Sequence, residues 1–282
     1  MKMWIEGARP KTLIASLSPV LIGSVIAFKS GSLDWGIFLA CAVFSLAVQI
    51  GTNFANDYID FLKGADTKER KGPRRLVQAG LVSPEKMRTV TFGVFGVAAL
   101  VGLYLMWVGG WQIGVLALMA ILLGYLYTGG PYPLGYLGLG DLFVLIFFGP
   151  VAVAGVTYLQ TGVVSPVAIL AGFPPGFLST AILAINNLRD CEQDQKVGKK
   201  TLPVRFGLSF GKWEFALCLT GAALIPLFQQ NLLPSIATLA LGAPLIGNVF
   251  KAERAETIAP LFPKVGRLQT IYTFFFCVGW LL

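Results

Sequence analysis

The stretch NFANDYIDFLKGAD, residues 53–66, organises this chain, because it places several carboxylates directly after a long apolar run. Asn56 and Asp60 lie four residues apart, so on a continuous helix they share one face. Gly64 is expected to end that helix, which leaves Asp66 in the loop that follows. If the apolar run crosses a membrane, carboxylates at its end are costly to place there and are usually functional.

A second polar stretch, NNLRDCEQD at residues 186–194, repeats this arrangement after another long apolar run. Aligning the two stretches on their asparagines places Asp60 on Asp190, and Asp194 follows four residues later. Oxygen ligands suit a hard cation, and magnesium binds through a few carboxylates together with substrate phosphates. We therefore predict that the two clusters face each other and hold a diphosphate through Mg²⁺. The alternative, solvated helix ends paired with nearby cations, explains one aspartate better than two matching clusters.

The composition is that of an integral membrane protein. Of 282 residues, 55% are hydrophobic and 13% are charged, whereas a soluble domain carries about 25% charged residues. The apolar residues form separate long runs, which predicts membrane helices, since barrel strands alternate with a period of two. The net charge of +8 comes from basic loops, so no nucleic-acid partner is expected, and no removable signal peptide is expected either. The absence of histidine excludes a histidine base and the usual zinc sites.

Nine apolar segments are predicted to cross the bilayer, for which a helix needs about 20 residues. Proline is expected to kink the first segment at Pro19 and to break or bend the sixth at Pro174 and Pro175. The predicted segments are 12–29, 35–56, 89–108, 111–128, 142–159, 165–187, 213–229, 232–249 and 268–282.

The distribution of basic residues predicts the orientation of these segments. With the amino terminus inside, every Lys and Arg except Lys29 lies on the inner side, as the positive-inside rule requires. Both acidic clusters then lie on the cytoplasmic side of the inner (cytoplasmic) membrane, each at the end of a helix that enters from outside. The two halves of the chain therefore form a parallel, pseudosymmetric repeat within one domain, residues 1–282, and the repeat brings the clusters together across one cavity.

Basic side chains near the clusters are candidates for completing a phosphate site, because Mg²⁺ alone leaves part of a diphosphate's charge unpaired. The alternative is that these cations only fix the topology, since the positive-inside rule explains most loop cations without a further function. The candidates in the two loops are Lys63, Arg74, Arg75, Arg189, Lys199 and Arg205.

The connection between the fourth and fifth segments, TGGPYPLGYLGLGD at residues 128–141, is rich in Gly, Pro and Tyr and carries one charge, Asp141. Tyr127, Tyr132 and Tyr136 offer aromatic faces that can steady a cation. The alternative is a Pro-Gly turn with aromatic residues at the membrane surface. Most of the abundant Phe residues are expected to face lipid or pack between helices, and a few are candidates for lining a groove for an isoprenoid tail.

These motifs resemble those of the UbiA superfamily of intramembrane prenyltransferases. The similar stretches are NDYIDFLKGAD, YTGGPYPLGYLGLGD and NNLRDCEQDQKVGKKTLPVRFG, and the similarity extends over nearly the whole chain. Within the superfamily, two features are most similar to the MenA subfamily, the 1,4-dihydroxy-2-naphthoate polyprenyltransferases. These are the G-x-D form of the first motif and the stretch GPRRLVQAG, which stands where many members carry an RP-x-x-x-G form.

The resemblance implies nine transmembrane helices around a central cavity and a magnesium-dependent reaction. It implies transfer of a polyprenyl group from an allylic prenyl diphosphate to 1,4-dihydroxy-2-naphthoate, with loss of CO₂ and diphosphate. The product would be demethylmenaquinone, which leaves into the membrane lipid. Several alternatives stay open. They are another aromatic acceptor such as 4-hydroxybenzoate, a phytyl donor, and, from a different class, a secondary transporter with ion sites near the membrane midplane.

The resemblance also implies roles for individual residues. It assigns catalysis and the binding of magnesium diphosphate to Asp60, Asp66, Asp190 and Asp194. With no histidine in the chain, an aspartate or the released diphosphate is expected to accept any proton. The other residues that the resemblance places at the substrates are Asn56, Asn186, Arg74, Lys199, Arg205, Tyr127 and Asp141.

Overall fold

The computed structural model describes residues 2–66 and 72–282, and every regular element in these ranges is a helix. This confirms the predicted all-α class. The α-helices are α1 (Lys2–Ala8), α2 (Leu13–Lys29), α3 (Trp35–Leu62), α4 (Pro84–Gly109), α5 (Trp111–Leu126), α6 (Gly140–Phe147), α7 (Pro150–Thr161), α8 (Pro166–Lys196), α9 (Leu202–Phe206), α10 (Leu208–Phe228), α11 (Leu232–Lys251), α12 (Ala255–Ile258) and α13 (Phe262–Leu281), with the short 3-10 helices η1 (Pro10–Thr12) and η2 (Ala259–Leu261).

Three of the long helices, α3, α4 and α8, begin at capping side chains that precede the apolar runs. The Asp34 carboxylate accepts a hydrogen bond of 2.9 Å from the backbone N–H of Ile37 at the start of α3. Ser83 and Ser165 cap α4 and α8 in the same way. At its other end α3 is followed by Gly64 at φ 69°, a left-handed conformation that costs glycine little. The predicted end of this helix is therefore confirmed.

Seven helical stretches in the described ranges are long and apolar enough to cross a membrane. The outer faces of the bundle expose large apolar side chains such as Leu100, Trp107 and Leu217, which suit contact with lipid. The chain is therefore an integral, multi-pass membrane protein. All nine predicted segments overlap helices, but a count of nine spans is not confirmed. Helix α5 has only 16 residues, and α13 is not among the seven stretches.

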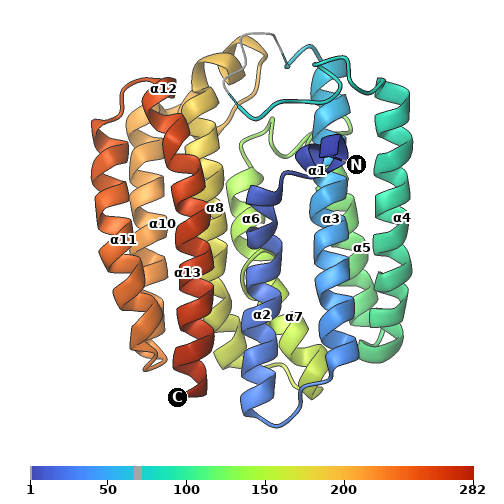
Figure 1. Ribbon diagram of the computed structural model, residues 1–282, viewed down its shortest axis with the longest axis vertical. Coiled ribbons are helices and arrows are strands. Elements are labelled where there is room, and N and C mark those ends of the chain that lie inside the picture. The colour runs from blue at the N-terminus through green and yellow to red at the C-terminus, as the bar shows by residue number, and fades with distance from the viewer. Residues whose placement is uncertain (1, 67–71) are drawn as a thin grey trace.

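The two halves of the chain lie side by side, each built around one long helix (Figure 1). Helix α3 packs most extensively against α4, and α8 against α10. Both α3 and α8 end at the upper end of the bundle in Figure 1, where the loops that follow them also lie. This is the arrangement that a parallel repeat predicts, and it brings both acidic clusters to the same end of the molecule. We call this end the polar end.

A break or bend is predicted at Pro174 and Pro175, but helix α8 continues through both residues, so the break is wrong and the bend stays a prediction. Proline removes a backbone donor and crowds the preceding turn, but neighbouring helices can stabilise a membrane helix that contains it. Helix α8 has such neighbours, because 72% of its apolar window is buried inside the bundle. Helix α2 likewise continues through Pro19.

The interruption lies instead in the predicted fifth segment, which divides into α6 and α7 at Gly149 and Pro150. Pro150 begins α7 and has no N–H with which to continue α6. Gly172 and Gly176 of α8 pack directly on this junction, and a Cβ added to Gly176 would lie 3.0 Å from the Gly149 Cα. The sequence gives no sign of this backbone contact, because it joins residues that are distant in the chain.

Candidate active site

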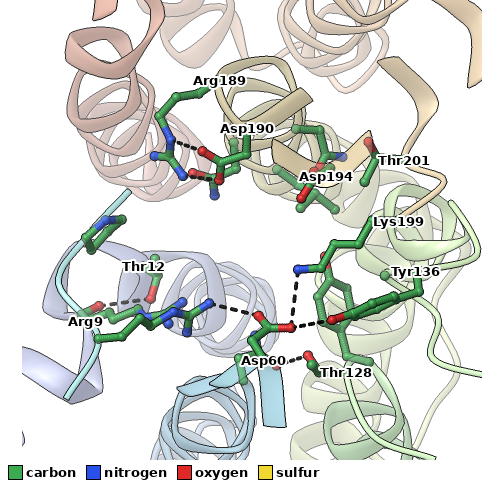
Figure 2. Close-up of a pocket in the computed structure, with 18 of the residues that line it drawn as sticks. Arg9, Thr12, Asp60, Thr128, Tyr136, Arg189, Asp190, Asp194, Lys199 and Thr201 are labelled. Atoms are coloured by element: carbon green, nitrogen blue, oxygen red, sulfur yellow. Dashed lines mark hydrogen bonds and ion pairs between the residues drawn. The ribbon is translucent and has the colours of Figure 1, made fainter. Parts of the chain in front are cut away.

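Both acidic clusters lie mainly on helices, because α3 continues to Leu62 and α8 continues to Lys196. The cluster on α3 forms one wall of a polar cavity of about 120 Å³, and the cluster on α8 forms the opposite wall. Figure 2 shows Asp60 on the first wall and Asp190 and Asp194 on the second. The continuous helices therefore carry carboxylates from two distant parts of the sequence to one site.

Asp57 has a structural role, although it belongs to the first cluster. Its buried carboxylate accepts hydrogen bonds from the backbone N–H groups of Leu76 at 2.8 Å and Val77 at 3.0 Å. These bonds hold the segment that carries Arg75 against α3. Asp57 is thus turned away from the cavity and supports it from behind.

Replacing Asp57 with asparagine is expected to lower the free energy of unfolding by about 2 kcal/mol, because the amide NH₂ group cannot accept one of the two backbone donors. Thermal unfolding in detergent measures this change as a lower Tm. Asp34→Asn is the matched control, since asparagine caps a helix as well as aspartate does. Equal Tm values for the two variants would contradict the structural role of Asp57.

Asp60 lies at the centre of the first wall and joins three segments of the chain. Its carboxylate accepts a hydrogen bond from the Tyr136 hydroxyl at 2.9 Å. It also lies 3.2 Å from the Arg75 guanidinium and 3.3 Å from the Lys199 ammonium (Figure 2). Only 5% of the Asp60 side chain is exposed. A charge this deeply buried requires close partners, and these three supply them.

Arg75 lies between Asp60 and Asp66, the two carboxylates of the first cluster that are candidates for binding magnesium diphosphate. Its Nε lies 3.3 Å from the Asp66 carboxylate, while its other side contacts Asp60. The Asp66 side chain is 2% exposed and does not line the cavity. Asp66 therefore contacts Arg75, which itself lines the cavity.

The second wall carries an ion pair with two parallel contacts. Arg189 donates to both oxygens of Asp190, from Nε at 2.7 Å and from its terminal nitrogen at 2.6 Å. Asp194 lies one helical turn further along, with its side chain buried. Between them, Gln193 donates a hydrogen bond of 2.9 Å to the carbonyl of Ala65. This bond ties α8 to the segment that follows α3 and so fixes the spacing of the two walls.

Two ammonium groups lie against the ring of Tyr136 in the loop between α5 and α6. The Lys63 Nζ is 4.5 Å and the Lys199 Nζ 4.8 Å from the ring centroid. Burial, followed by the charge of Asp60, raises the pKa of Tyr136 well above its ordinary value, so its hydroxyl stays protonated and donates to Asp60. Burial also lowers the pKa of Lys63, although Asp60 opposes this change. The Tyr136 hydroxyl and the ammonium groups of Lys63 and Lys199 therefore lie together beside one carboxylate, that of Asp60.

The structure brings most of the predicted site residues together and leaves others outside the cavity. Arg74 has an exposed side chain and does not line it. Arg205 donates to the backbone carbonyls of Lys200 at 3.0 Å and Leu137 at 2.7 Å, which joins two loops. The predicted residues that line the polar cavity are Asn56, Asp60, Tyr127, Asn186, Asp190, Asp194 and Lys199.

Asp141 lies behind the second wall. It is buried at the start of α6 and accepts a hydrogen bond of 3.2 Å from Asn187, which itself lines the cavity. Asp141 therefore contacts a residue of the cavity wall but not the cavity itself.

Several cavity residues were not selected from the sequence. Arg75 and Arg189 were among the cations considered, but the sequence does not say which of two adjacent arginines points inward. Arg9 and Thr12 were missed entirely, and both line the cavity. Arg9 adopts φ 53°, and the Thr12 hydroxyl donates to its carbonyl at 2.9 Å. No sequence signal marks such a conformation at arginine, which rarely adopts it.

A second, apolar cavity of about 320 Å³ continues from the polar one into the bundle. Helices α2 to α8 contribute to its walls, and its far end is bounded by Cys41, Leu105 and Leu159. The side chains that line both cavities are Arg9, Thr12, Asn56, Tyr127, Leu183 and Asn186. The two compartments therefore match the chemistry of a ligand with an anionic head and an apolar tail.

The donor set of the polar cavity fits a magnesium ion that is shared with a phosphate ligand. Among residues 2–66 and 72–282, no three carboxylates, thiols or imidazoles converge closely enough to form a metal cage by themselves. The two walls nevertheless present Asp60, Asp190 and Asp194 with the amides of Asn56 and Asn186, all of which offer oxygen ligands. Mg²⁺ binds through one or two carboxylates together with substrate phosphates, so an incomplete protein cage is the expected arrangement.

Comparison with known sequences identifies one family. The model of the UbiA prenyltransferase family matches residues 16–276. The 1,4-dihydroxy-2-naphthoate octaprenyltransferase of Haemophilus influenzae is 33% identical to the chain, and the match covers 100% of this chain and 96% of the relative. The 1,4-dihydroxy-2-naphthoate octaprenyltransferase of Mycobacterium tuberculosis is 42% identical over 72% of this chain and 70% of its own length.

Comparison with solved structures supports the same fold. A UbiA homologue from Archaeoglobus fulgidus, bound to GPP and Mg²⁺, superposes with a TM-score of 0.62 and covers 99% of this chain and 100% of its own. The two sequences are 13% identical, so this likeness concerns the fold alone.

Proposed function

Because the chain belongs to the UbiA prenyltransferase family, we propose that it transfers a polyprenyl group from an allylic prenyl diphosphate to 1,4-dihydroxy-2-naphthoate, giving CO₂, diphosphate and the quinol form of demethylmenaquinone. The observation that carries this proposal is the direct connection of the polar cavity to the apolar one. A prenyl diphosphate has the same two parts. The choice of acceptor follows the relatives, which are named for this naphthoate.

The charges of the polar cavity suit a diphosphate that arrives with its cation. The cavity is lined by the carboxylates of Asp60, Asp190 and Asp194, and Arg75, Arg189 and Lys199 neutralise two of them through direct ion pairs. When a diphosphate binds, these cations can turn to its oxygens, and the carboxylates are released for Mg²⁺. Ion pairs within the protein are thus exchanged for ion pairs with the ligand, which limits the cost of removing the charges from water.

Mg²⁺ held between the carboxylates of both walls would neutralise the charge that grows on the diphosphate as the carbon–oxygen bond breaks. The chain's own contribution to stabilising this charge comes from Arg75, Arg189 and Lys199, which line the same cavity. Tyr136 stays protonated beside Asp60, so it adds a hydrogen-bond donor at this point.

The apolar cavity provides the second requirement of the reaction, which is protection of an allylic cation from water. Side chains from α5, α6 and α7 that line it, such as Leu123, Phe147 and Val151, carry no nucleophile. The electron-rich naphthoate ring attacks the terminal allylic carbon, and loss of the ring carboxylate as CO₂ restores the aromatic system. With no histidine in the chain, an aspartate of the cavity or the released diphosphate accepts and returns the hydroxyl proton.

The orientation in the membrane forms part of the proposal. The polar end carries the basic loops, and of all Lys and Arg residues only Lys29 lies in a loop segment expected outside. We infer that the protein lies in the inner (cytoplasmic) membrane and that its polar end faces the cytoplasm. The water-soluble diphosphate head and the acceptor then reach the cavity from the cytoplasm. The apolar product leaves sideways into the bilayer.

The acceptor assignment predicts a clear preference. Membranes that contain the protein and Mg²⁺, supplied with a prenyl diphosphate, are expected to use 1,4-dihydroxy-2-naphthoate at least about tenfold better in kcat/KM than 4-hydroxybenzoate, since a site built for a ring's polar groups rejects rings that lack them. Mass spectrometry of the extracted lipid identifies the product. Membranes without the protein serve as the control. Product from 4-hydroxybenzoate alone would contradict the assignment, and a comparison of prenyl with phytyl diphosphate tests the donor.

A further inference from the structure

The walls of the apolar cavity differ in chemistry. The wall formed by α5, α6 and α7 is apolar along its whole length below Tyr127, with side chains such as Leu116, Leu123, Phe143 and Phe147. The wall formed by α2 and α3 instead contains a row of polar side chains at helical spacing. The polar members of this wall on α3 are Ser45, Gln49, Thr52, Asn53 and Asn56. A prenyl tail has no polar atoms, so these groups have no use in binding the tail.

Two hydroxyl groups of the α2 and α3 wall bond to their own helices. The Thr52 hydroxyl donates to the carbonyl of Val48 at 2.8 Å, and on α2 the Ser16 hydroxyl donates to the carbonyl of Leu13 at 2.9 Å. Hydroxyl groups in membrane helices commonly bond in this way and then need no ligand. The Gln49 side chain is longer and ends in a carboxamide, which cannot bond to the carbonyl of the preceding turn in the same manner.

The orientation of the Gln49 amide follows from its neighbours. The Asn53 Nδ2 donates to the carbonyl of Ala8 at 2.9 Å and to the Thr12 hydroxyl at 3.2 Å. A carbonyl can only accept, so the Asn53 oxygen must point the other way, where it accepts from the Gln49 Nε2 at 3.4 Å. The Gln49 Oε1 is therefore turned away from Asn53, and no side chain or backbone donor in residues 2–66 and 72–282 bonds to it.

We propose that Gln49 binds the aromatic acceptor, with its carboxamide oxygen accepting a hydrogen bond from the ring hydroxyl at position 4. This inference rests on the proposed function and names the subsite for its second substrate. Gln49 lies two helical turns below Asn56, about 10 Å along the axis of α3. Asn56 lines both cavities, so a two-ring acceptor that lies along α3 between these residues has one edge at the diphosphate end. The tail then occupies the opposite, apolar wall.

This assignment is tested by combining a substitution of Gln49 with an acceptor analogue that lacks one hydroxyl. In purified protein reconstituted into liposomes, Gln49→Leu is expected to raise the KM for 1,4-dihydroxy-2-naphthoate about tenfold, because a buried hydroxyl loses its acceptor. The KM for the prenyl diphosphate should not change. The wild type should also bind 1-hydroxy-2-naphthoate, measured as a competing ligand, about tenfold more weakly than the substrate, because this analogue lacks one hydroxyl. Gln49→Leu should bind both rings alike.

Controls separate this role from a structural one. Gln112→Leu makes the same change at an exposed position outside both cavities and should leave all these constants unchanged. Gln49→Met is a second variant with the same expectation if the leucine variant does not fold. The inference would be overturned, and the proposed function would stand, if the Gln49 variants discriminated between the two rings as well as the wild type does. An equal increase in the KM for the naphthoate and in the KM for the prenyl diphosphate would lead to the same conclusion. A wild type that makes no product from the naphthoate would overturn the proposed function, and the inference with it.

Discussion

Replacing Asp60 with asparagine is expected to lower kcat for prenyl transfer by about a thousandfold, because the change removes the carboxylate of the first cluster that lines the cavity. Asparagine keeps the size of the side chain and can still accept from Tyr136. It cannot balance the charges of Arg75 and Lys199, which lie 3.2 Å and 3.3 Å from the aspartate. Single-turnover formation of the lipid product in liposomes measures the loss.

The matched control for this variant is Asp34→Asn, at the opposite end of the same helix. Asp34 caps α3 and lies outside both cavities, so its replacement should leave kcat unchanged. The melting temperature of each variant shows whether the fold is intact. A folded Asp60→Asn protein with the wild-type kcat would show that the polar cavity is not the active site.

The second large effect is expected at Arg75 and not at its neighbour. Arg75→Lys should lower kcat/KM for the prenyl diphosphate by about a hundredfold, because lysine cannot contact two carboxylates and a phosphate with one planar group. The Arg75 side chain is 5% exposed and spans Asp60 and Asp66. Lysine retains the positive charge, so the two buried carboxylates keep a partner and the fold is preserved.

Arg74→Lys provides the comparison for Arg75→Lys, since the same change is made one residue earlier in the chain. Arg74 is exposed and does not line the polar cavity, so its variant should have wild-type kinetics. The reverse result, with a large loss at Arg74 and none at Arg75, would mean that the segment after α3 is placed differently when substrate binds.

The main features of the fold and of the two clusters could be predicted from the sequence because they depend on local rules. Long apolar runs predict membrane helices, and the four-residue spacing of Asn56 and Asp60 predicts a shared helical face. The same spacing in Asp190 and Asp194, after a second apolar run, predicts a second cluster. Matching patterns in the two halves of the chain then suggest that both clusters reach the same end of the bundle.

Other features depend on contacts between distant residues, and the sequence does not encode them in any local pattern. The sequence places Asp57 and Asp60 in one cluster, but only the structure shows that Asp57 accepts from the backbone of Leu76 and Val77. The inward direction of Arg75 depends on those same two bonds. The placement of Arg9 depends on a left-handed backbone that neighbouring packing holds in place.

The expected break at the proline pair is wrong for the same reason. A proline pair predicts a broken helix, but the burial of α8 on many sides outweighs the lost hydrogen bonds at Pro174 and Pro175. The actual break at Gly149 is stabilised by close backbone contact with Gly172 and Gly176. Local propensity therefore predicts where a helix is weak, and tertiary packing decides whether it breaks.

The joint action of the two clusters on one magnesium diphosphate is tested most directly by binding rather than by turnover. Titration of purified protein with geranyl thiodiphosphate, an analogue that ionises very slowly, should show binding that requires Mg²⁺ and is abolished by EDTA. Asp60→Asn and Asp190→Asn should each weaken this binding, because the two residues lie on opposite walls of the cavity. Binding that is independent of Mg²⁺, or that survives unchanged in either variant, would contradict a site shared by both clusters.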